Sequence, residues 1–260
     1  MKRNFNQRNT QQRRHHIMQI VQEQGEVSVE QLVQLFDTSE VTIRKDLTAL
    51  ETNGFLLRRY GGAVLMPQEI IEDEQDEQDE LSERKLVIAK AASERIRDHN
   101  RIIVDSGSTT AALIKQLNRK QGLVVMTNSL SVATELRSLE NEPTLLMTGG
   151  TWDTRSESFQ GKVAEQVLRS YDFDQLFIGA DGVDLERGTT TFNELVGLSQ
   201  VMAEVSREVI VMVESQKIGR KMPNLELNWQ QIDVLITDHL LSEQDKVMIE
   251  QQNVEVIIAK

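Results

Sequence analysis

Two short amphipathic segments between residues 28 and 54 give the clearest pattern in this sequence. The first begins at Ser28, and Gln31 three positions later is typical of a capping box at a helix start. Apolar residues then recur at the spacing of one helix face: Val29, Leu32, Val33 and Phe36. The pattern stops at Asp37-Thr38-Ser39, residue types that favour turns and N-caps. A further helix is expected ahead of them, over residues 13–24, with these side chains facing inward: Ile17, Ile20 and Val21.

The second segment predicts another helix, with Ile43, Leu47 and Leu50 on its inner side and Gly54 as its C-terminal stop. Two short helices joined by a three-residue turn indicate a helix-turn-helix. The outer side of the second helix carries groups that hydrogen-bond base edges and phosphates: Thr42, Arg44, Lys45 and Thr48. This face predicts contact with double-stranded DNA.

A β-hairpin is expected next, because the runs 55–59 and 63–65 flank the turn Tyr60-Gly61-Gly62. The arginine pair Arg58-Arg59 lies near its tip, where a wing would contact the DNA backbone. The complete set of predicted DNA contacts is Ser39, Thr42, Arg44, Lys45, Thr48, Arg58, Arg59 and Tyr60.

After Leu81 the pattern changes to helical segments that alternate with short β-branched runs. Helices are expected near residues 81–97, 109–117, 129–139, 161–171, 194–206 and 242–252. Strands are expected at residues 101–104, 123–126, 144–147, 175–178, 209–213, 234–236 and 254–258. This alternation predicts a mostly parallel sheet covered on both faces. The expected fold class is therefore α/β, preceded by an N-terminal winged helix-turn-helix.

Charge is distributed unevenly along the 260 residues, whose net charge is −12. Residues 1–66 hold nine Lys and Arg against seven Asp and Glu, which leaves about −14 on the rest. A mildly basic head on an acidic body indicates a DNA-binding module joined to a domain that does not bind DNA. Residues 67–83 open with proline and contain nine acidic and no basic residues, as expected of a linker. The expected organisation is a DNA-binding domain over 1–66, an acidic linker over 67–80 and an α/β domain over 81–260.

The composition excludes several classes of protein. Cysteine is absent, which rules out disulfides and thiol chemistry and suits a reducing cytoplasm. No apolar run approaches the roughly 20 residues of a membrane span. The basic start is not followed by the apolar segment of a secretory signal. We therefore expect a cytoplasmic protein that does not contact membranes.

Small polar residues follow five of the expected strands, at the strand ends where α/β sheets bind ligands. These segments are residues 105–110, 127–129, 148–150, 179–184 and 214–217. In the first segment, glycine and hydroxyl groups lead into a helix whose N–H groups and dipole attract an anion. Each segment alone is also an ordinary helix N-cap, but five of them, with Lys217 as the one lysine, favour a pocket for an anionic small molecule. No P-loop, dinucleotide fingerprint or metal-ligand spacing is found, so neither a cofactor nor a metal is expected.

The first 66 residues resemble the N-terminal domain of the DeoR family of bacterial sugar-metabolism regulators. The matching residues are Arg14, Ile17, Thr42-Ile43-Arg44-Lys45-Asp46-Leu47, Leu50, Gly54 and Arg59-Tyr60-Gly61-Gly62. Both runs match in register, which makes the resemblance specific. For Asp46 an ordinary structural role is the alternative, namely the orientation of a neighbouring arginine.

Residues 81–260 look like the effector domain of the same family, which is similar in fold to ribose-5-phosphate isomerase. The matching segments are 105–110, 126–129, 147–150, Gly161 with Glu165, 179–184, 190–194, and Lys217 with Gly219-Arg220. Where the family has D-S-S-K-F-G, this chain has Glu214-Ser215-Gln216-Lys217-Ile218-Gly219. This departure places contacts from residues 214, 216 and 218 in doubt. The segments 158–161 and 184–194 are most similar to regulators of hexitol and amino-sugar pathways.

The resemblance implies a phosphorylated sugar as effector. The phosphate would be held by Ser106 to Thr110 and paired with Lys217, and the sugar would face Asp181, Asp184 and Glu194. The predicted effector contacts are Asp105, Ser106, Gly107, Ser108, Thr109, Thr110, Thr127, Asn128, Ser129, Gly149, Gly150, Asp181, Asp184, Asn193, Glu194 and Lys217.

These observations favour a transcriptional regulator, most often a repressor in this family, whose affinity for operator DNA is controlled by a sugar phosphate. Two other functions remain open. Acidic residues and Lys217 could form the acid/base set of an isomerase or deaminase, although such an enzyme needs no DNA-binding module. The chain could also be an architectural DNA binder with a purely structural C-terminal domain. Because one helix-turn-helix makes few contacts, we also expect a dimer or tetramer.

Overall fold

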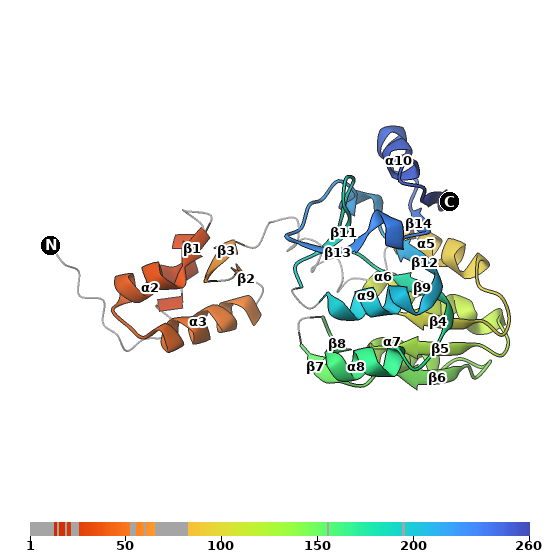
Figure 1. Ribbon diagram of the computed structural model, residues 1–260, viewed down its shortest axis with the longest axis horizontal. Helices are drawn as coiled ribbons and strands as arrows, with labels where there is room; N and C mark the ends of the chain where they lie inside the picture. The colour runs from red at the N-terminus through yellow and green to blue at the C-terminus, as the bar shows by residue number, and fades with distance from the viewer. Residues whose placement is uncertain are drawn as a thin grey trace. The chain divides into compact units, whose positions relative to one another are not determined.

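The computed structural model describes residues 13, 14, 16–18, 20, 21, 26–52, 56–59, 61–65, 83–154, 156–193 and 196–260. The chain divides into two compact units, residues 1–80 and 81–260 (Figure 1). Each unit has a hydrophobic core of its own. Among the described residues, no helix combines the length and the apolar character needed to cross a membrane.

The smaller unit contains the two predicted helices, α2 (Val29–Phe36) and α3 (Glu40–Thr52). Helix α2 starts with the expected capping box, in which Ser28 Oγ accepts from the Gln31 N–H and Gln31 Oε1 accepts from the Ser28 N–H. The inward residues of both helices share one core with apolar residues from the preceding segment: Ile17, Val21, Leu32, Phe36, Ile43, Leu47 and Leu50. The helix-turn-helix is confirmed.

The wing is a three-stranded sheet rather than a hairpin alone. Strands β2 (Leu56–Arg59) and β3 (Gly62–Leu65) form the predicted hairpin, and β1 (Glu26–Ser28) pairs with the other side of β3. A side chain at Gly62 would place its Cβ 2.3 Å from the Val27 carbonyl oxygen, so this pairing requires glycine there. Strand β1 was not predicted, because three residues are too few to show an alternating pattern.

All seven predicted strands of the larger unit are present: β4 (Arg101–Val104), β5 (Val124–Thr127), β6 (Thr144–Met147), β9 (Phe173–Ile178), β12 (Ser206–Met212), β14 (Val234–Thr237) and β15 (Glu255–Ile258). They form one sheet in the order β15-β14-β12-β9-β4-β5-β6, in which every neighbouring pair is parallel. Runs such as Ile102-Ile103-Val104 are buried without interruption, as a strand covered on both faces requires. The α/β fold class is confirmed.

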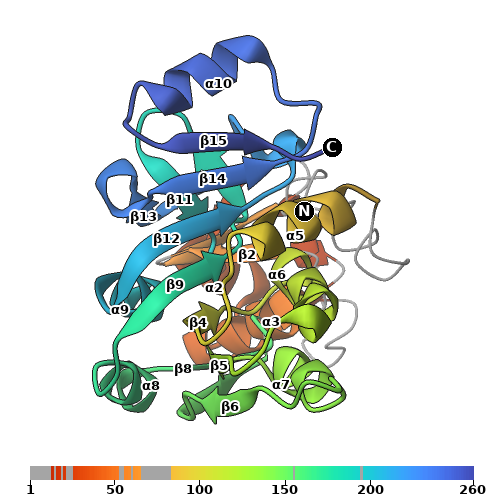
Figure 2. The same ribbon diagram turned by 90° about the vertical axis from the view of Figure 1, so that its right-hand side faces the viewer.

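Helices cover both faces of this sheet (Figure 2). Helices α5 (Glu83–Glu94), α6 (Ser108–Ile114) and α7 (Leu130–Leu136) share a core with Ile102, whose side chain points to their face. Helices α8 (Lys162–Leu168), α9 (Gly197–Glu204) and α10 (Glu243–Glu250) share a second core with the next residue, Ile103. Adjacent strand residues thus enter opposite cores, which is the alternation expected of β-strands.

Short polar strands were missed by the sequence analysis. They are the hairpin β7 (Thr151–Asp153) with β8 (Ser158–Gln160), and the antiparallel sheet β10 (Gly182–Asp184), β11 (Gly188–Thr191) and β13 (Asn224–Asn228). Two short 3₁₀ helices were also missed, η2 (Ser215–Lys217) and η3 (Trp229–Gln231), and a third, η1 (Lys115–Arg119), overlaps the end of the helix expected near residues 109–117. These strands are rich in glycine, threonine and asparagine, which are common in turns, so local pattern does not distinguish them from loops.

Candidate functional sites

The order of strands in the large sheet reverses between β4 and β9. From β4 the chain runs outward through β5 to β6, and it then returns to the other side of β4 to build β9, β12, β14 and β15. Where neighbouring strands connect in opposite directions, a crevice opens beyond their carboxyl ends, and α/β proteins bind ligands there. The polar segments 105–110 and 179–184 directly follow β4 and β9. Two of the five predicted segments therefore meet at this switch point.

The segments that follow β4 and β5 are joined by Asn128. Its Nδ2 donates to Asp105 Oδ1 over 2.7 Å, and its Oδ1 accepts from the Ser106 N–H over 3.1 Å. Burial raises the pKa of Asp105 to about 6, even though hydrogen bonds from Ser106 and Asn128 act in the opposite direction. A carboxyl group that titrates near neutrality at a switch point is a feature typical of functional sites.

The turn between β4 and α6 depends on Gly107 and Thr110. Gly107 has a φ of 134°, which side-chain-bearing residues rarely adopt. Thr110 Oγ1 donates to the carbonyl oxygens of Asp105 and Gly107, each at 2.9 Å. The Thr110 hydroxyl is thus engaged inside the turn. The Ser106 side chain also bonds to Asp105. The predicted phosphate contacts of this turn stay predictions.

The ends of β5 and β6 are covered by the β7–β8 hairpin. The Phe159 N–H of this hairpin donates to the Asn128 carbonyl over 2.8 Å. A Cβ at Gly150 would lie 2.6 Å from the Gln160 carbonyl oxygen, so glycine permits this approach. The Thr127 hydroxyl accepts from the Ser129 N–H, and Ser129 caps α7. Thr127, Ser129 and Gly150 therefore have clear structural roles beside the predicted contacts, which remain predictions.

Asp181 follows β9 and is exposed, and one of its carboxylate oxygens accepts a hydrogen bond. Thr191 Oγ1 donates to Asp181 Oδ2 over 2.6 Å, and the Thr191 hydroxyl accepts from the Asn193 N–H over 3.0 Å. These bonds bring together the segments 179–184 and 190–193, both of which were assigned to the site by the family resemblance. Glu194, predicted to face the sugar, lies outside the described residues.

Glu226 is a site residue that the sequence analysis missed. Strand β13 pairs with β11 through an irregular register, in which Thr189 opposes Leu227 and Thr190 opposes Leu225. Glu226 therefore has no opposite residue and forms a β-bulge. Bulges re-aim a side chain relative to the alternation of its strand, and they are frequent next to functional sites.

The bulge places the Glu226 carboxyl group in a buried, acidic environment. Burial raises its pKa to about 8, with further contributions from the negative charges of Asp105 and Asp181. Ser199 Oγ of α9 donates to Glu226 Oε1 over 2.8 Å and acts in the opposite direction. Three carboxyl groups from three segments therefore influence one another at the carboxyl edge of the sheet, and the raised pKa of Glu226 favours its protonated form at neutral pH.

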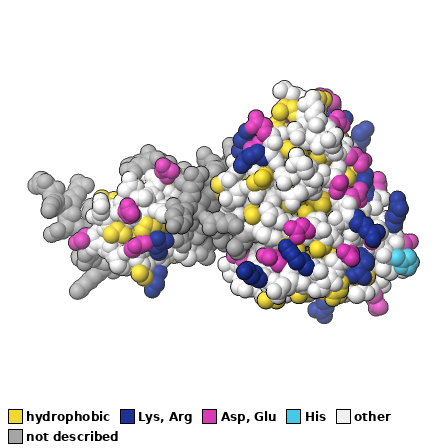
Figure 3. Space-filling model, in the orientation of Figure 1, with side chains coloured by type: hydrophobic (Ala, Val, Ile, Leu, Met, Phe, Trp, Pro, Cys, Tyr) yellow, Lys and Arg dark blue, Asp and Glu magenta, His cyan; other side chains and the backbone are white. Residues whose placement is uncertain are grey.

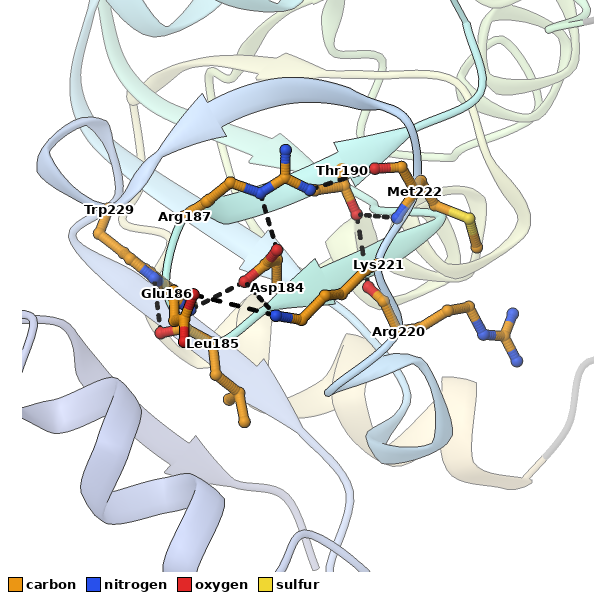
Figure 4. A network of polar contacts seen from close by, with 9 residues as sticks. All are labelled: Asp184, Leu185, Glu186, Arg187, Thr190, Arg220, Lys221, Met222 and Trp229. Carbon is orange, nitrogen blue, oxygen red and sulfur yellow. Dashed lines mark hydrogen bonds and ion pairs between the residues drawn. The ribbon is translucent and has the colours of Figure 1, made fainter.

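Asp184, also predicted to face a sugar, lies in a network of ion pairs on the small antiparallel sheet (Figure 4). Its Oδ2 accepts from Arg187 Nε over 2.7 Å, and its Oδ1 accepts from the Glu186 N–H over 2.9 Å and lies 3.7 Å from Lys221 Nζ. Although burial opposes the shift, the bond from Arg187 and the other partners lower the pKa of Asp184. The carboxylate is thus 2% exposed, ionised and engaged through both oxygens. The predicted sugar contact stays a prediction.

Lys217 ends the turn η2, which follows β12 on the far side of β9. Asp238 holds this turn, because its two oxygens accept from the Ser215 N–H and the Ser215 hydroxyl, each at 2.8 Å. Burial alone would raise the pKa of Asp238, but these hydrogen bonds lower it. The next residues return to β10, where the Gly219 N–H donates to the Val183 carbonyl over 2.8 Å. The Lys217 backbone is therefore fixed at two places.

The outer side of α3 has the arrangement predicted for a DNA-binding face. Arg44, Lys45 and Thr48 are exposed, and Thr42 is half-buried behind Ser39, whose Oγ accepts from the Thr42 N–H. Arg44 donates through Nε and Nη2 to Glu40 Oε1, at 2.8 and 2.6 Å. The other edge of the guanidinium group retains donors for a base or phosphate. Arg58 and Arg59 are residues of β2, and Tyr60 lies outside the described residues.

Asp46 has the structural role that was considered for it. It is 1% exposed, and its two carboxylate oxygens accept from Arg13 Nε and Arg14 Nε. These bonds attach the basic N-terminal segment to the inner side of α3. On the visible face of the larger unit, by contrast, acidic and basic side chains are interspersed without a continuous basic field (Figure 3).

Among the described residues, no group of His, Asp and Glu side chains is arranged to hold a metal ion. Several of their acidic residues are engaged by arginine, by backbone N–H groups or by hydroxyl groups, among them Asp46, Asp184 and Asp238.

Two family models match this chain. Residues 13–69 match the DeoR-like helix-turn-helix domain, and residues 80–239 match the DeoR C-terminal sensor domain. Together the two models span both units of the structure.

Curated relatives match almost the whole chain. A putative aga operon transcriptional repressor from Escherichia coli O157:H7 is 38% identical over 96% of this chain and 94% of its own length. The HTH-type transcriptional regulator GlpR from Haloferax volcanii is 32% identical, over 95% and 96%. The HTH-type transcriptional regulator GolR from Listeria innocua is 30% identical, over 89% and 92%.

Among solved structures, ribose 5-phosphate isomerase A from Methanocaldococcus jannaschii has 20% sequence identity and a TM-score of 0.38. That match covers 52% of this chain and 53% of the isomerase. An initiation factor eIF-2B structure from Pyrococcus horikoshii has 14% identity and a TM-score of 0.41, over 87% and 86%. These likenesses are too distant to add to the fold assignment, which rests on the strand order.

Proposed function

Because this chain belongs to the DeoR family of DNA-binding transcriptional regulators, we propose that it represses a carbohydrate-utilisation operon and releases its operator when a phosphorylated sugar binds. The proposed effector site lies at the switch point between β4 and β9, and the proposed DNA contacts lie on α3 and the wing. The observation that carries the proposal is the meeting of polar segments at this switch point within a sensor domain.

The phosphate is proposed to bind at the start of α6. Backbone N–H groups of the segment from Ser106 to Thr110 would donate to its oxygens. Lys217 would supply the counter-charge from the turn after β12. A dianion in a domain of net negative charge needs such a cation, because the nearby carboxyl groups oppose its binding. We therefore expect Lys217 to contribute much of the effector affinity.

The sugar is proposed to face Asp181 and the segment 190–194. Asp181 has one oxygen bound by Thr191 and a second that can accept from a sugar hydroxyl. The pairing of Asp184 with Arg187 and Lys221 argues against its use as a general base, which must be free to take up a proton. The site is therefore proposed to bind a sugar phosphate without turning it over.

A homo-oligomer is proposed as the state that binds DNA. One helix-turn-helix reads few base pairs, so regulators pair two of them on repeated half-sites. The larger unit is the part with enough surface to hold subunits together. We expect a dimer or a tetramer.

The proposal is tested with Lys217→Ala and a control, Lys246→Ala. Lys246 is a partly buried lysine of α10 that pairs with Glu250. Helix α10 precedes the edge strand β15, so this lysine lies outside the proposed site between β4 and β9. A panel of sugar phosphates is first screened by thermal shift on the full chain. The ligand that binds is then titrated into each variant bound to operator DNA.

The ligand should weaken operator binding of the parent about 5–150-fold, the range of common allosteric couplings. Lys246→Ala should respond in the same way, whereas Lys217→Ala should bind the operator and hardly respond. An equal response of Lys217→Ala and the parent would place the phosphate elsewhere. If the ligand tightened operator binding, the protein would be co-repressed or an activator. Turnover of the ligand would restore the enzyme interpretation.

A further inference from the structure

Four exposed residues of α3 form a stripe along the helix. Val41, Arg44, Lys45 and Thr48 follow the i, i+3, i+4, i+7 spacing that places side chains on one helix face, and all four are exposed. The opposite face is fixed in the core by these residues: Ile43, Asp46, Leu47 and Leu50. Among the described side chains of α3, these four therefore lie on the side that faces away from the core, and Val41 is the first of them.

Val41 is the apolar member of this stripe. It is 64% exposed, although the hydrophobic core of the same unit lies behind the helix. Val41 has no hydrogen-bonding group in its side chain, so its residue type did not predict a DNA contact. A single exposed apolar side chain on a protein surface needs no explanation. The position of Val41 in line with the base-reading residues is what carries the argument.

The base edges of DNA offer one apolar group in the major groove, the C5 methyl of thymine. Recognition helices enter this groove with their N-terminal residues nearest to the bases, and Val41 lies in the first turn of α3. We propose that Val41 is a specificity-determining residue of the DNA interface, and that its side chain packs against the C5 methyl group of one thymine per recognition helix. This inference rests on the DNA-binding role of α3 and is independent of the effector.

The test uses the full chain and an operator selected with it from random duplexes. Each thymine of that operator is replaced, one at a time, by deoxyuridine, which lacks only the C5 methyl group. For the parent, one substitution per half-site should weaken binding about fourfold, the effect of burying one methyl group. Val41→Ser changes both recognition helices of a dimer, so it should weaken binding to the thymine operator about sixteenfold, the product of two fourfold effects, and should be insensitive to deoxyuridine at that position.

Leu35→Ser is the matched control. Leu35 is 56% exposed in the same unit but belongs to α2, outside the stripe of α3. This variant should retain the fourfold dependence on the thymine methyl group. Circular dichroism of both variants should match the parent, and the comparison of thymine with deoxyuridine in the parent needs no variant.

Two results would overturn the proposal: no thymine methyl group matters to the parent, or Val41→Ser keeps the full dependence on it. Either result leaves the regulator function intact, since the operator is still bound specifically. Failure of the selection to yield any preferred sequence would instead refute sequence-specific DNA binding by the chain, and the proposal with it.

Discussion

The buried Glu226 should make the stability of the sensor domain depend on pH between about pH 6 and about pH 8. In the folded protein, burial and the charge of Asp105 raise its pKa from 4.5 to about 8. Such a carboxyl group binds its proton more tightly in the folded than in the unfolded chain. The contribution of Glu226 to the free energy of unfolding is therefore fully present at acidic pH and is lost as the pH rises toward 8.

The size of the effect follows from the shift. Each unit of pKa difference corresponds to about 1.4 kcal/mol, and the loss accumulates between the unfolded and folded pKa values. Asp105, whose pKa is raised to about 6, loses its own contribution mainly at lower pH. Between about pH 6 and about pH 8, Glu226 should therefore lower the free energy of unfolding by about 2 kcal/mol. Glu226→Gln keeps the shape of the side chain and removes this titration.

The assay is urea unfolding followed by tryptophan fluorescence. Both tryptophans, Trp152 and Trp229, belong to the larger unit, so the signal reports the domain that contains Glu226. Trp229 is 2% exposed and lies close to Glu226 in the chain, at the end of β13. The stability of Glu226→Gln relative to the parent should rise by about 2 kcal/mol over this pH range.

A second variant tests the cause of the shift. The Ser199 hydroxyl donates to Glu226 and stabilises its ionised form, so Ser199→Ala should move the loss of stability to higher pH. Parallel pH profiles for the parent and Glu226→Gln would refute the reasoning. They would mean that the bulge leaves this carboxyl group in contact with water.

Two further predictions concern the DNA-binding unit. Asp46→Asn should destabilise that unit by about 3 kcal/mol, because it removes the buried carboxylate that pairs with Arg13 and Arg14; hydrogen exchange of α3 measures this, and unchanged protection would contradict it. The fragment 1–66 should bind operator DNA much more weakly than the full chain, because it lacks the unit expected to pair two recognition helices; equal affinity in a titration with labelled DNA would show that pairing is unnecessary.

The helices and the large sheet could be predicted because their signals are local. Helical periodicity from Val29 to Phe36 reflects one buried face, and the uninterrupted run Ile102-Ile103-Val104 reflects a strand buried on both faces. The predicted helix over 194–206 was too long, because α9 ends at Glu204 and β12 begins at Ser206. Apolar and polar residues alternate in no regular order around residues 204–206, so no periodicity marks where the helix ends. The start of β12 is set instead by its pairing with β9.

The candidate site could be predicted only in part, for a similar reason. Its polar segments were visible because strand ends are recognisable in the sequence. Their internal bonds were not, and the bond from Asn128 to Asp105 joins residues that are far apart in the chain. Asp184 was predicted to face the sugar from the family resemblance, but Arg187 and Lys221 decide what its carboxylate can do. No sequence pattern distinguishes a free carboxylate from a paired one.

Glu226 shows why long-range pairing limits such predictions most strongly. In the run Leu225-Glu226-Leu227, simple alternation would place both leucines on one face and the glutamate on the other. The bulge against β11 instead leaves Leu225 exposed and Leu227 buried. The direction of Glu226 thus depends on a register set by residues 188–191, almost forty positions earlier. The same bulge places Glu226 close enough to sense the charge of Asp105. Its protonation at neutral pH removes one negative charge from the edge where a phosphate is proposed to bind, which lowers the electrostatic cost of binding that anion.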